Sequence, residues 1–351
     1  TFDILIHFEK NNDPINIIFN IIGAAAAAPI ILNIVLIGSL FFSKWINISD
    51  VLALSYAVSL AGFLQLIVLF FFVRKNFKPI LSVKIKIDEK IKLFFRKLLP
   101  SIFSSGVTQI NILVGTIIAS FQAGAVSYLY YADRVYQMNL AVAGIAVGTV
   151  MLPELSKHIK NNNSEQVTSL QNRALELCLF LSIPAAVALM LASEQIITSL
   201  FGYGSFGNES VINTAIALTF FAIGVPAFSI LKIFSNYFFA RDDTKTPFYL
   251  SVVSVILNVL ISVSFFKKFG FVIIPIATSI SSWINVFLHF HFIRKRNLYT
   301  FDKIFIYKFP RMILSVVVMG IILYLLLGLF SDKFVYNESW KFIYLFIIVI
   351  L

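Results

Sequence analysis

Long apolar stretches, separated by short polar connections, follow one another along almost the whole chain. A helix needs about 20 mostly apolar residues to cross the hydrocarbon core of a bilayer, because only a helix satisfies its own backbone polar groups there. The pattern therefore predicts an all-α, polytopic transmembrane helical bundle of about ten spans. The predicted spans are 17–43, 49–73, 97–119, 127–152, 171–193, 211–239, 247–266, 271–293, 309–330 and a tenth that begins at Trp340.

The connections between these spans alternate between rich and poor in lysine and arginine. Twenty of these residues lie in one set of connections (74–97, 153–173, 240–246 and 294–311), and five lie in the opposite set. Cytoplasmic loops near span ends are enriched in Lys and Arg. We therefore expect the basic set to be cytoplasmic and the first span to run outward. The net charge of +11 is then mostly this topological bias, and we expect no nucleic-acid partner.

Composition narrows the function class. The chain is 59% hydrophobic and only 13% charged, with a mean hydropathy of +0.90, whereas a soluble domain is about one quarter charged. Phosphate-binding glycine loops and paired metal-ligand spacings are missing from the sequence. We therefore expect a membrane protein that is not an enzyme and has no cofactor or metal. Because the chain starts at Thr1 and stops at Leu351 within an apolar stretch, we expect a fragment of a longer protein.

Ionisable residues inside the predicted spans are the strongest candidates for function, because each costs about 2.5–3.5 kcal/mol at the bilayer centre. Arg134 lies about seven residues into its span, next to Asp133, and Lys232 lies in the middle of span 211–239. We predict that Arg134 and Lys232 face a water-filled cavity and hold an anionic substrate, with arginine offering a bidentate fork for phosphate. An interhelical ion pair, or side chains that extend to the membrane surface, would explain the same residues.

Polar residues also form a stripe in span 97–119, where Gln109 and Asn111 accompany several serines and threonines. Such a stripe suits the wall of a cavity. Hydrogen bonding between helices explains the serines and threonines equally well.

One run of residues is specific enough to suggest a family. The sequence YYADRVYQ at 130–137, continued by GIAVGT at 144–149 and LPELS at 152–156, closely resembles the signature of the MurJ/MviN lipid II flippase family. The stretches QIN at 109–111, IAS at 118–120 and ARDDTKTP at 240–247 support the resemblance. Members of that family have fourteen spans and move a lipid-linked peptidoglycan precursor outward by alternating access. The resemblance implies that this chain corresponds to spans five to fourteen, with the last unfinished.

The resemblance also implies how the chain is organised. Residues 1–16 would be a cytoplasmic lead-in, and 17–152 would hold the last part of the N-terminal lobe and the start of the C-terminal lobe. Residues 153–330 would form the remainder of the C-terminal lobe with five spans. Residues 331–351 would be a loop and a truncated last span.

Roles for individual residues follow from the same resemblance. Arg134 matches an arginine of the family's central cavity that is placed to meet the pyrophosphate, and Lys232 matches a lysine common at its position. Asp133 would orient or neutralise Arg134, and Asn111 and Gln109 complete the predicted substrate-binding set. Asn139 stands where the family usually has proline. The resemblance therefore does not imply a helix kink at this position.

Some members of the family resemble sodium-coupled transporters. The corresponding positions here are Gly115, Asn258, Ser262, Ile274 and Thr278, and two of them, Gly115 and Ser262, replace carboxylates. Because a hard cation prefers charged or well-aimed oxygens, Asn258 and Thr278 are only weak sodium candidates.

The sequence thus leads to one principal functional hypothesis. We expect a multi-pass flippase of the bacterial inner membrane that translocates lipid II from the cytoplasmic to the periplasmic leaflet. Its partners would be lipid II, membrane lipids and, as further candidates, cell-wall synthesis proteins. Since no nucleotide-binding motif is present, the membrane potential or an ion gradient would supply the energy. A related multidrug or polysaccharide exporter and an inactive fragment that only binds other proteins are the alternatives.

Overall fold

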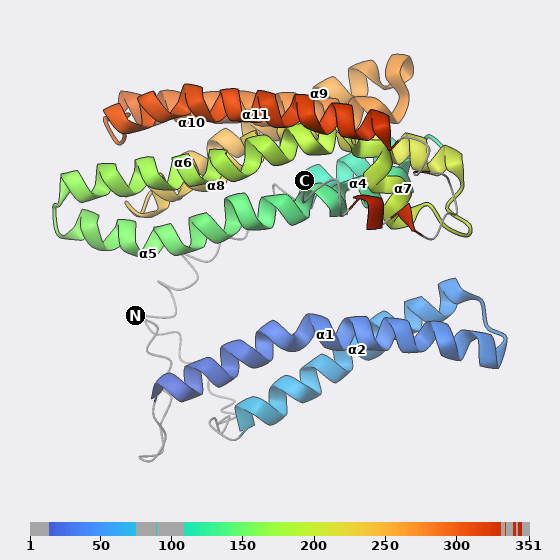
Figure 1. Cartoon of the computed structure of the whole chain (residues 1–351). Coiled ribbons are helices and arrows are strands. Elements are labelled where there is room, and N and C mark those ends of the chain that lie inside the picture. Colours follow the sequence, from blue (N-terminus) through green and yellow to red (C-terminus); the bar gives the residue numbers. More distant parts are fainter. Residues whose placement is uncertain are drawn as a thin grey trace. The chain divides into compact units, whose positions relative to one another are not determined.

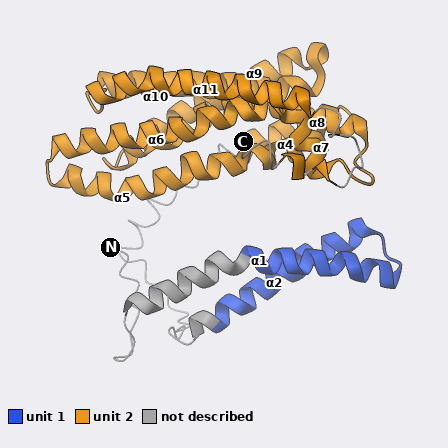
Figure 2. Cartoon of the chain, in the orientation of Figure 1, with its two compact units in different colours: residues 1–87 blue, residues 88–351 orange. Residues whose placement is uncertain are grey.

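The computed structural model describes residues 14–74, 89, 109–330, 334, 340, 341 and 343–345 (Figure 1). Every regular element in these residues is a helix, which confirms the prediction of an all-α bundle. The predicted lead-in 1–16, the first half of span 97–119 and the tenth span fall largely outside the described residues. Contacts divide the chain into unit 1, residues 1–87, and unit 2, residues 88–351, which Figure 2 colours separately.

Unit 1 is a helical hairpin. Helix α1, Pro14–Ile46, and helix α2, Asp50–Arg74, pack along each other and cover the first two predicted spans. The turn between them uses Asn47 with a positive φ of 55°, a conformation that asparagine tolerates. The hydroxyl of Ser43 donates a 2.6 Å hydrogen bond to Asp50, which holds the end of α1 against the start of α2.

Unit 2 contains the remaining helices, and Figure 1 shows its long helices running side by side. Helix α8 lies at the centre of unit 2, since 67% of its apolar span is buried, against 39% of the span in α6 and 22% of the span in α11. Neighbours of α8 include α4, α5, α6, α7 and α10. The elements are a helix at Gln109–Ala119, α4 (Ala125–Leu140), the π-helical segment η1 (Ala141–Ala146), α5 (Val147–Lys160), α6 (Ser164–Leu191), α7 (Ser193–Phe201), α8 (Asn208–Phe239), α9 (Lys245–Phe269), η2 (Gly270–Val272), α10 (Ile273–Lys295) and α11 (Lys303–Leu329).

Seven stretches of the described chain are long and apolar enough to cross a membrane. One of them, Lys245–Lys295, joins α9, η2 and α10 and therefore contains two of the predicted spans. The helix Gln109–Ala119 is a shorter apolar helix that represents the described part of span 97–119. The structure thus confirms the polytopic architecture.

Several helices run beyond the predicted span ends. The fourth predicted span ends at residue 152, but the helix continues through Pro153 to Lys160, and α6 and α11 begin at Ser164 and Lys303 rather than at 171 and 309. Hydropathy detects only the apolar part of a helix, whereas these ends are polar and capped. The Asn163 side chain accepts from the amide of Gln166 at 3.1 Å, and Asp302 accepts from Phe305 at 2.6 Å.

Three connections that charge predicts to be cytoplasmic meet at one end of unit 2. Asn172 donates to the carbonyl of Thr300 at 2.9 Å, which joins α6 to the connection between α10 and α11. Arg296 forms a 2.5 Å ion pair with Asp243, which joins that connection to the turn after α8. Burial raises the pKa of Asp243, but hydrogen bonds from Thr246 and the Arg296 guanidinium outweigh it and hold the pKa below its ordinary value. The alternation of loops read from charge therefore corresponds to a real clustering of loops.

Two glycines of the family-like run allow η1 and α5 to approach α8. A Cβ added to Gly144 would lie 3.1 Å from the Cα of Ser229, and one added to Gly148 would lie 2.9 Å from the side-chain amide nitrogen of Asn236. That amide donates to the Gly148 carbonyl at 2.7 Å. Small residues at such positions are the usual means of close helix packing in membranes.

We expect Gly144→Val to lower the free energy of unfolding by about 1–3 kcal/mol, because the new side chain meets the α8 backbone, which cannot yield as a flexible side chain would. Gly328→Val is the matched control, since a Cβ there meets no described atom within 4 Å. Thermal unfolding of the purified protein in detergent measures both variants. Equal destabilisation by the two substitutions would contradict this account of the packing.

Candidate functional site

Unit 2 contains a cavity of about 490 Å³. This volume is typical of small-ligand sites. The helix Gln109–Ala119, α4 with η1, α9 and α10 form its walls, and Phe221 of α8 completes the lining. Most of the lining is apolar. Its polar side chains include Asn111, Asp133, Gln137, Asn258 and Thr278.

A hydrogen-bonded group of polar side chains connects three helices in the cavity wall. The Asn258 amide donates to the side-chain oxygen of Asn111 at 2.8 Å and to the hydroxyl of Thr278 at 3.4 Å. The hydroxyl of Ser262 donates in turn to the Asn258 side-chain oxygen at 3.3 Å. Asn258 and Ser262 are buried, so these bonds satisfy groups that would otherwise be costly in an apolar interior.

The structure brings together the positions that correspond to the sodium ligands of some relatives. All five, Gly115, Asn258, Ser262, Ile274 and Thr278, line this one cavity. A Cβ at Gly115 would lie 3.8 Å from a methyl group of Ile274, so the glycine leaves space where a carboxylate would stand. Asn258 and Thr278 already hydrogen-bond to each other. Sodium binding at these residues stays a prediction.

Asp133 supplies a carboxylate to the same cavity. It is half-buried, and the side-chain amide of Gln137 donates a hydrogen bond to it. Tyr136 is held between Phe221 and Phe228, with ring centroids at 4.9 and 5.3 Å. Since Gln137 lies one turn farther along the same helix, α4 presents Asp133 in a fixed orientation.

Arg134 takes a different direction from its neighbour. Its side chain is exposed on unit 2, and its guanidinium lies 4.7 Å from the centre of the Tyr130 ring. Arg134 does not belong to the lining of the cavity. At nine residues from the start of α4 it stands about 14 Å along the helix, well inside the stretch that composition assigns to the membrane.

Lys232 and Gln109 are also exposed on unit 2 and lie outside the cavity lining. The Lys232 side chain passes Gly144, since a Cβ there would lie 3.4 Å from its Cγ. Gly144 is ten residues beyond Arg134, or about 15 Å along the helix. The predicted substrate set therefore divides: Asn111 and Asp133 line the cavity, whereas Arg134, Lys232 and Gln109 lie on exposed faces.

The partner that positions Asp133 is not among the predicted site residues. This partner is Gln137 of the family-like run, and its spacing of four residues from Asp133 places the two side chains on one helical face. Phe221 carries no sequence signal of this kind, because it reaches the cavity from another helix.

Comparison with known proteins agrees with this architecture. A family model described as "Lipid II flippase MurJ" matches residues 19–345. A probable lipid II flippase MurJ of Rhizobium meliloti (strain 1021) is 38% identical over 305 residues, which cover 86% of this chain and 57% of the relative. One of Rickettsia prowazekii (strain Madrid E) is 34% identical over 278 residues, covering 78% of this chain and 54% of the relative.

A solved structure described as lipid II flippase MurJ in an inward closed conformation is also similar, with a TM-score of 0.73 and 26% identity. The match covers 93% of this chain and 65% of that structure. The chain thus spans a little over half the length of the curated relatives. Its apolar helices and its relatives identify a multi-pass protein of the bacterial inner membrane. The match over residues 19–345 shows that the chain belongs to the lipid II flippase MurJ family.

Proposed function

We propose that this protein acts as a transporter, not an enzyme, and moves lipid II from the cytoplasmic to the periplasmic leaflet by alternating access. The observation that carries the proposal is Arg134, an exposed arginine deep in an apolar span and inside the run that resembles the family signature. In this proposal lipid II is the substrate, and its pyrophosphate is the group that binds Arg134.

The physical support lies in the cost of placing this charge. An arginine at the centre of a span costs about 2.5–3.5 kcal/mol on insertion scales when it faces lipid. The Tyr130 ring offsets only part of this cost, because a cation–π contact contributes about 0.5–2 kcal/mol. A wet passage that receives an anion accounts for the remainder, and a guanidinium binds pyrophosphate oxygens bidentately.

The other predicted residues receive supporting roles in this proposal. Lys232 provides a second cation farther along the path, and Gln109 provides a neutral hydrogen-bonding group on an exposed face. Asn111 and Asp133 line the cavity, where Asn111 joins its helix to α9 through Asn258. The π-helical segment η1 follows Arg134 by seven residues, and such segments are frequent at functional sites.

We also propose that the membrane potential or an ion gradient drives the transport. Three or more clustered metal-ligating His, Cys, Asp or Glu side chains are absent from the described residues. Asn258 and Thr278 offer sodium only neutral oxygens, and Asp133, the carboxylate in the lining of the same cavity, is already hydrogen-bonded to Gln137. We therefore expect replacement of sodium by choline to leave translocation nearly unchanged. A strict requirement for sodium would contradict this part of the proposal.

Rescue of cells depleted of their lipid II flippase tests the proposed function. Because the chain spans 57% of the Rhizobium meliloti relative, we would place the preceding segment of that relative before residue 19. The relative itself is the positive control, and this chain alone and an empty vector are the comparisons. We expect the fusion to restore growth and to raise the fraction of lipid II that an impermeant reagent reaches from outside.

The same experiment separates the alternatives. Rescue of growth without a change in accessible lipid II would favour a different role in wall synthesis. A fusion that is present in the membrane and active on other amphiphiles, but not on lipid II, would favour a related exporter. Neither result is compatible with the function proposed here.

A further inference from the structure

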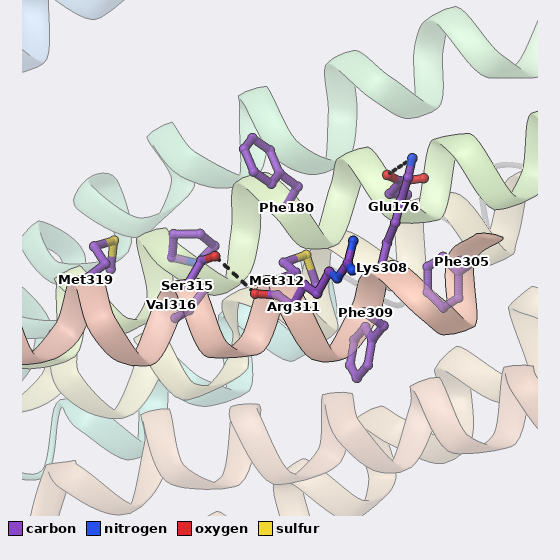
Figure 3. Close-up of a pocket in the computed structure, with 11 residues that line it drawn as sticks. Glu176, Phe180, Phe305, Lys308, Phe309, Arg311, Met312, Ser315, Val316 and Met319 are labelled. Carbon is purple, nitrogen blue, oxygen red and sulfur yellow. Dashed lines mark hydrogen bonds and ion pairs between the residues drawn. The ribbon is translucent and has the colours of Figure 1, made fainter.

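A groove of about 470 Å³ lies between α6 and α11, away from the cavity described above. Figure 3 shows its lining, with Glu176 and Phe180 on α6 facing Lys308, Arg311 and Met312 on α11. Farther along the two helices, the wall continues with Pro184 of α6 and with Val316 and Met319 of α11. The charged residues are confined to one end, and the remainder of the groove is almost wholly apolar.

The groove exists because the two helices touch at both of its ends. Lys308 binds Glu176 at 2.8 Å at the charged end. At the other end the helices approach at Gly320, where a Cβ would lie 3.2 Å from a methyl group of Val187. Twelve residues separate Lys308 from Gly320, which corresponds to about 18 Å of helix. This length is close to one leaflet of the hydrocarbon core, about 15 Å, so the groove matches one acyl chain of one leaflet.

The charges at the charged end of the groove do not cancel. Glu176 neutralises Lys308, but the ion pairs found within the described chain do not include Arg311. The Arg311 guanidinium lies 4.1 Å from the centre of the Tyr307 ring and hydrogen-bonds to its hydroxyl. Both contacts hold the guanidinium in place and leave its positive charge uncompensated. The hydroxyl of Ser315 is already used, because it donates to the Arg311 carbonyl at 3.0 Å.

The position of these charges indicates the leaflet. Lys308 and Arg311 lie in residues 294–311, the connection that the distribution of Lys and Arg assigns to the cytoplasm. The cytoplasmic leaflet is rich in anionic lipids, and each nearby cation contributes about 1 kcal/mol to their attraction.

We propose that this groove binds an anionic diacyl phospholipid of the inner leaflet, with its phosphate on Arg311 and one acyl chain along Phe180, Met312 and Val316. The bound lipid fills the gap between α6 and α11 and stabilises the attachment of α11 to the bundle. The site is separate from the path proposed for lipid II and does not depend on that function. A shallow apolar hollow of about 360 Å³ beyond Val316 lacks charged residues and offers no place for a headgroup.

Thermal unfolding of the purified protein in detergent, with added phosphatidylglycerol or phosphatidylcholine of the same acyl chains, tests the proposal. We expect phosphatidylglycerol to raise the midpoint of unfolding and phosphatidylcholine to have a clearly smaller effect. Arg311→Gln is expected to weaken phosphatidylglycerol binding about fivefold, the factor for loss of one interfacial cation. Arg311→Lys keeps the charge and should retain most of the preference.

Two further variants make the result specific to this groove. Arg173→Gln removes another exposed arginine, from α6, and should leave the lipid effect unchanged. Val316→Trp fills the groove without changing its charge and should weaken both lipids alike. The proposal is overturned if the two lipids stabilise equally, if Arg311→Gln behaves like Arg173→Gln, or if a polyprenyl phosphate replaces phosphatidylglycerol at equal concentration. None of these measurements depends on lipid II translocation, so the outcome is independent of the proposed function.

Discussion

Arg134→Ala in the fusion protein is expected to abolish rescue and to slow outward movement of lipid II by at least about 100-fold. A bidentate contact with a pyrophosphate comprises two hydrogen bonds to charged groups, each worth about 1.5 kcal/mol or more. Their sum of about 3 kcal/mol corresponds to a factor of about 100. The fraction of lipid II accessible to an impermeant reagent is the measurement. Arg134→Lys keeps the charge but not the fork, and we expect an intermediate rate.

Controls distinguish this role from a structural one. Arg173→Ala removes an exposed arginine from α6 and should leave the rate unchanged. If Arg134 served only to neutralise Asp133, then Asp133→Asn combined with Arg134→Gln would restore transport. The Arg134 side chain is exposed and lies against the Tyr130 ring, and the ion pairs among the described residues do not include Asp133 with Arg134, which argues against such a structural pair. Full activity of Arg134→Ala at normal abundance would disprove the assignment.

The second large effect concerns stability. Asn172→Leu is expected to lower the free energy of unfolding by about 3 kcal/mol or more. Asn172 is buried at 1% exposure and makes four hydrogen bonds: it donates to Thr168 and Thr300 carbonyls and accepts from the Tyr299 hydroxyl and the Asp302 amide. Leucine supplies none of these bonds. The Thr300 carbonyl, the Asp302 amide and the hydroxyl of the buried Tyr299 then lose this partner, and an unpaired group costs about 1–3 kcal/mol where it is buried.

Thermal unfolding in detergent, followed by loss of the monodisperse protein, measures this change. Tyr299→Phe removes a single bond to Asn172 and should cost about 1 kcal/mol. Thr168→Val leaves the backbone carbonyl that Asn172 uses and should have a small effect. If Asn172→Leu is no more harmful than Tyr299→Phe, the connection is stabilised by packing and not by this asparagine.

Asn172 also shows where prediction from sequence ends. It stands at the start of predicted span 171–193 and carries no signal of its own, because its partners at 299–302 are about 130 residues away. The same holds for the cavity wall, where Asn258 meets Asn111 across 147 residues. Resemblance to a family suggested that Asn258 and Thr278 share a site. Composition and spacing could not have done so, since hydrogen bonds between helices leave no periodic pattern.

The sequence by itself determined the features that depend on local chemistry. Apolar length identified the long helices of this chain, because the bilayer requires about 20 residues for each span, but not the short helix α7. The alternation of Lys and Arg paired the loops that the structure brings together. The run at 130–137 identified the family. Helix starts such as Ser164 and Lys303 were missed, because the capping side chains of Asn163 and Asp302 and not hydropathy set them.

Only the tertiary structure decided which of two adjacent charged residues enters the cavity. Asp133 and Arg134 are neighbours in the sequence, and each could have faced the bundle. The packing of α4 against α8, with Tyr136 held between Phe221 and Phe228, turns Asp133 inward and leaves Arg134 exposed. A rotation of about 100° per residue separates the two directions on a helix, and only contacts with other helices choose between them.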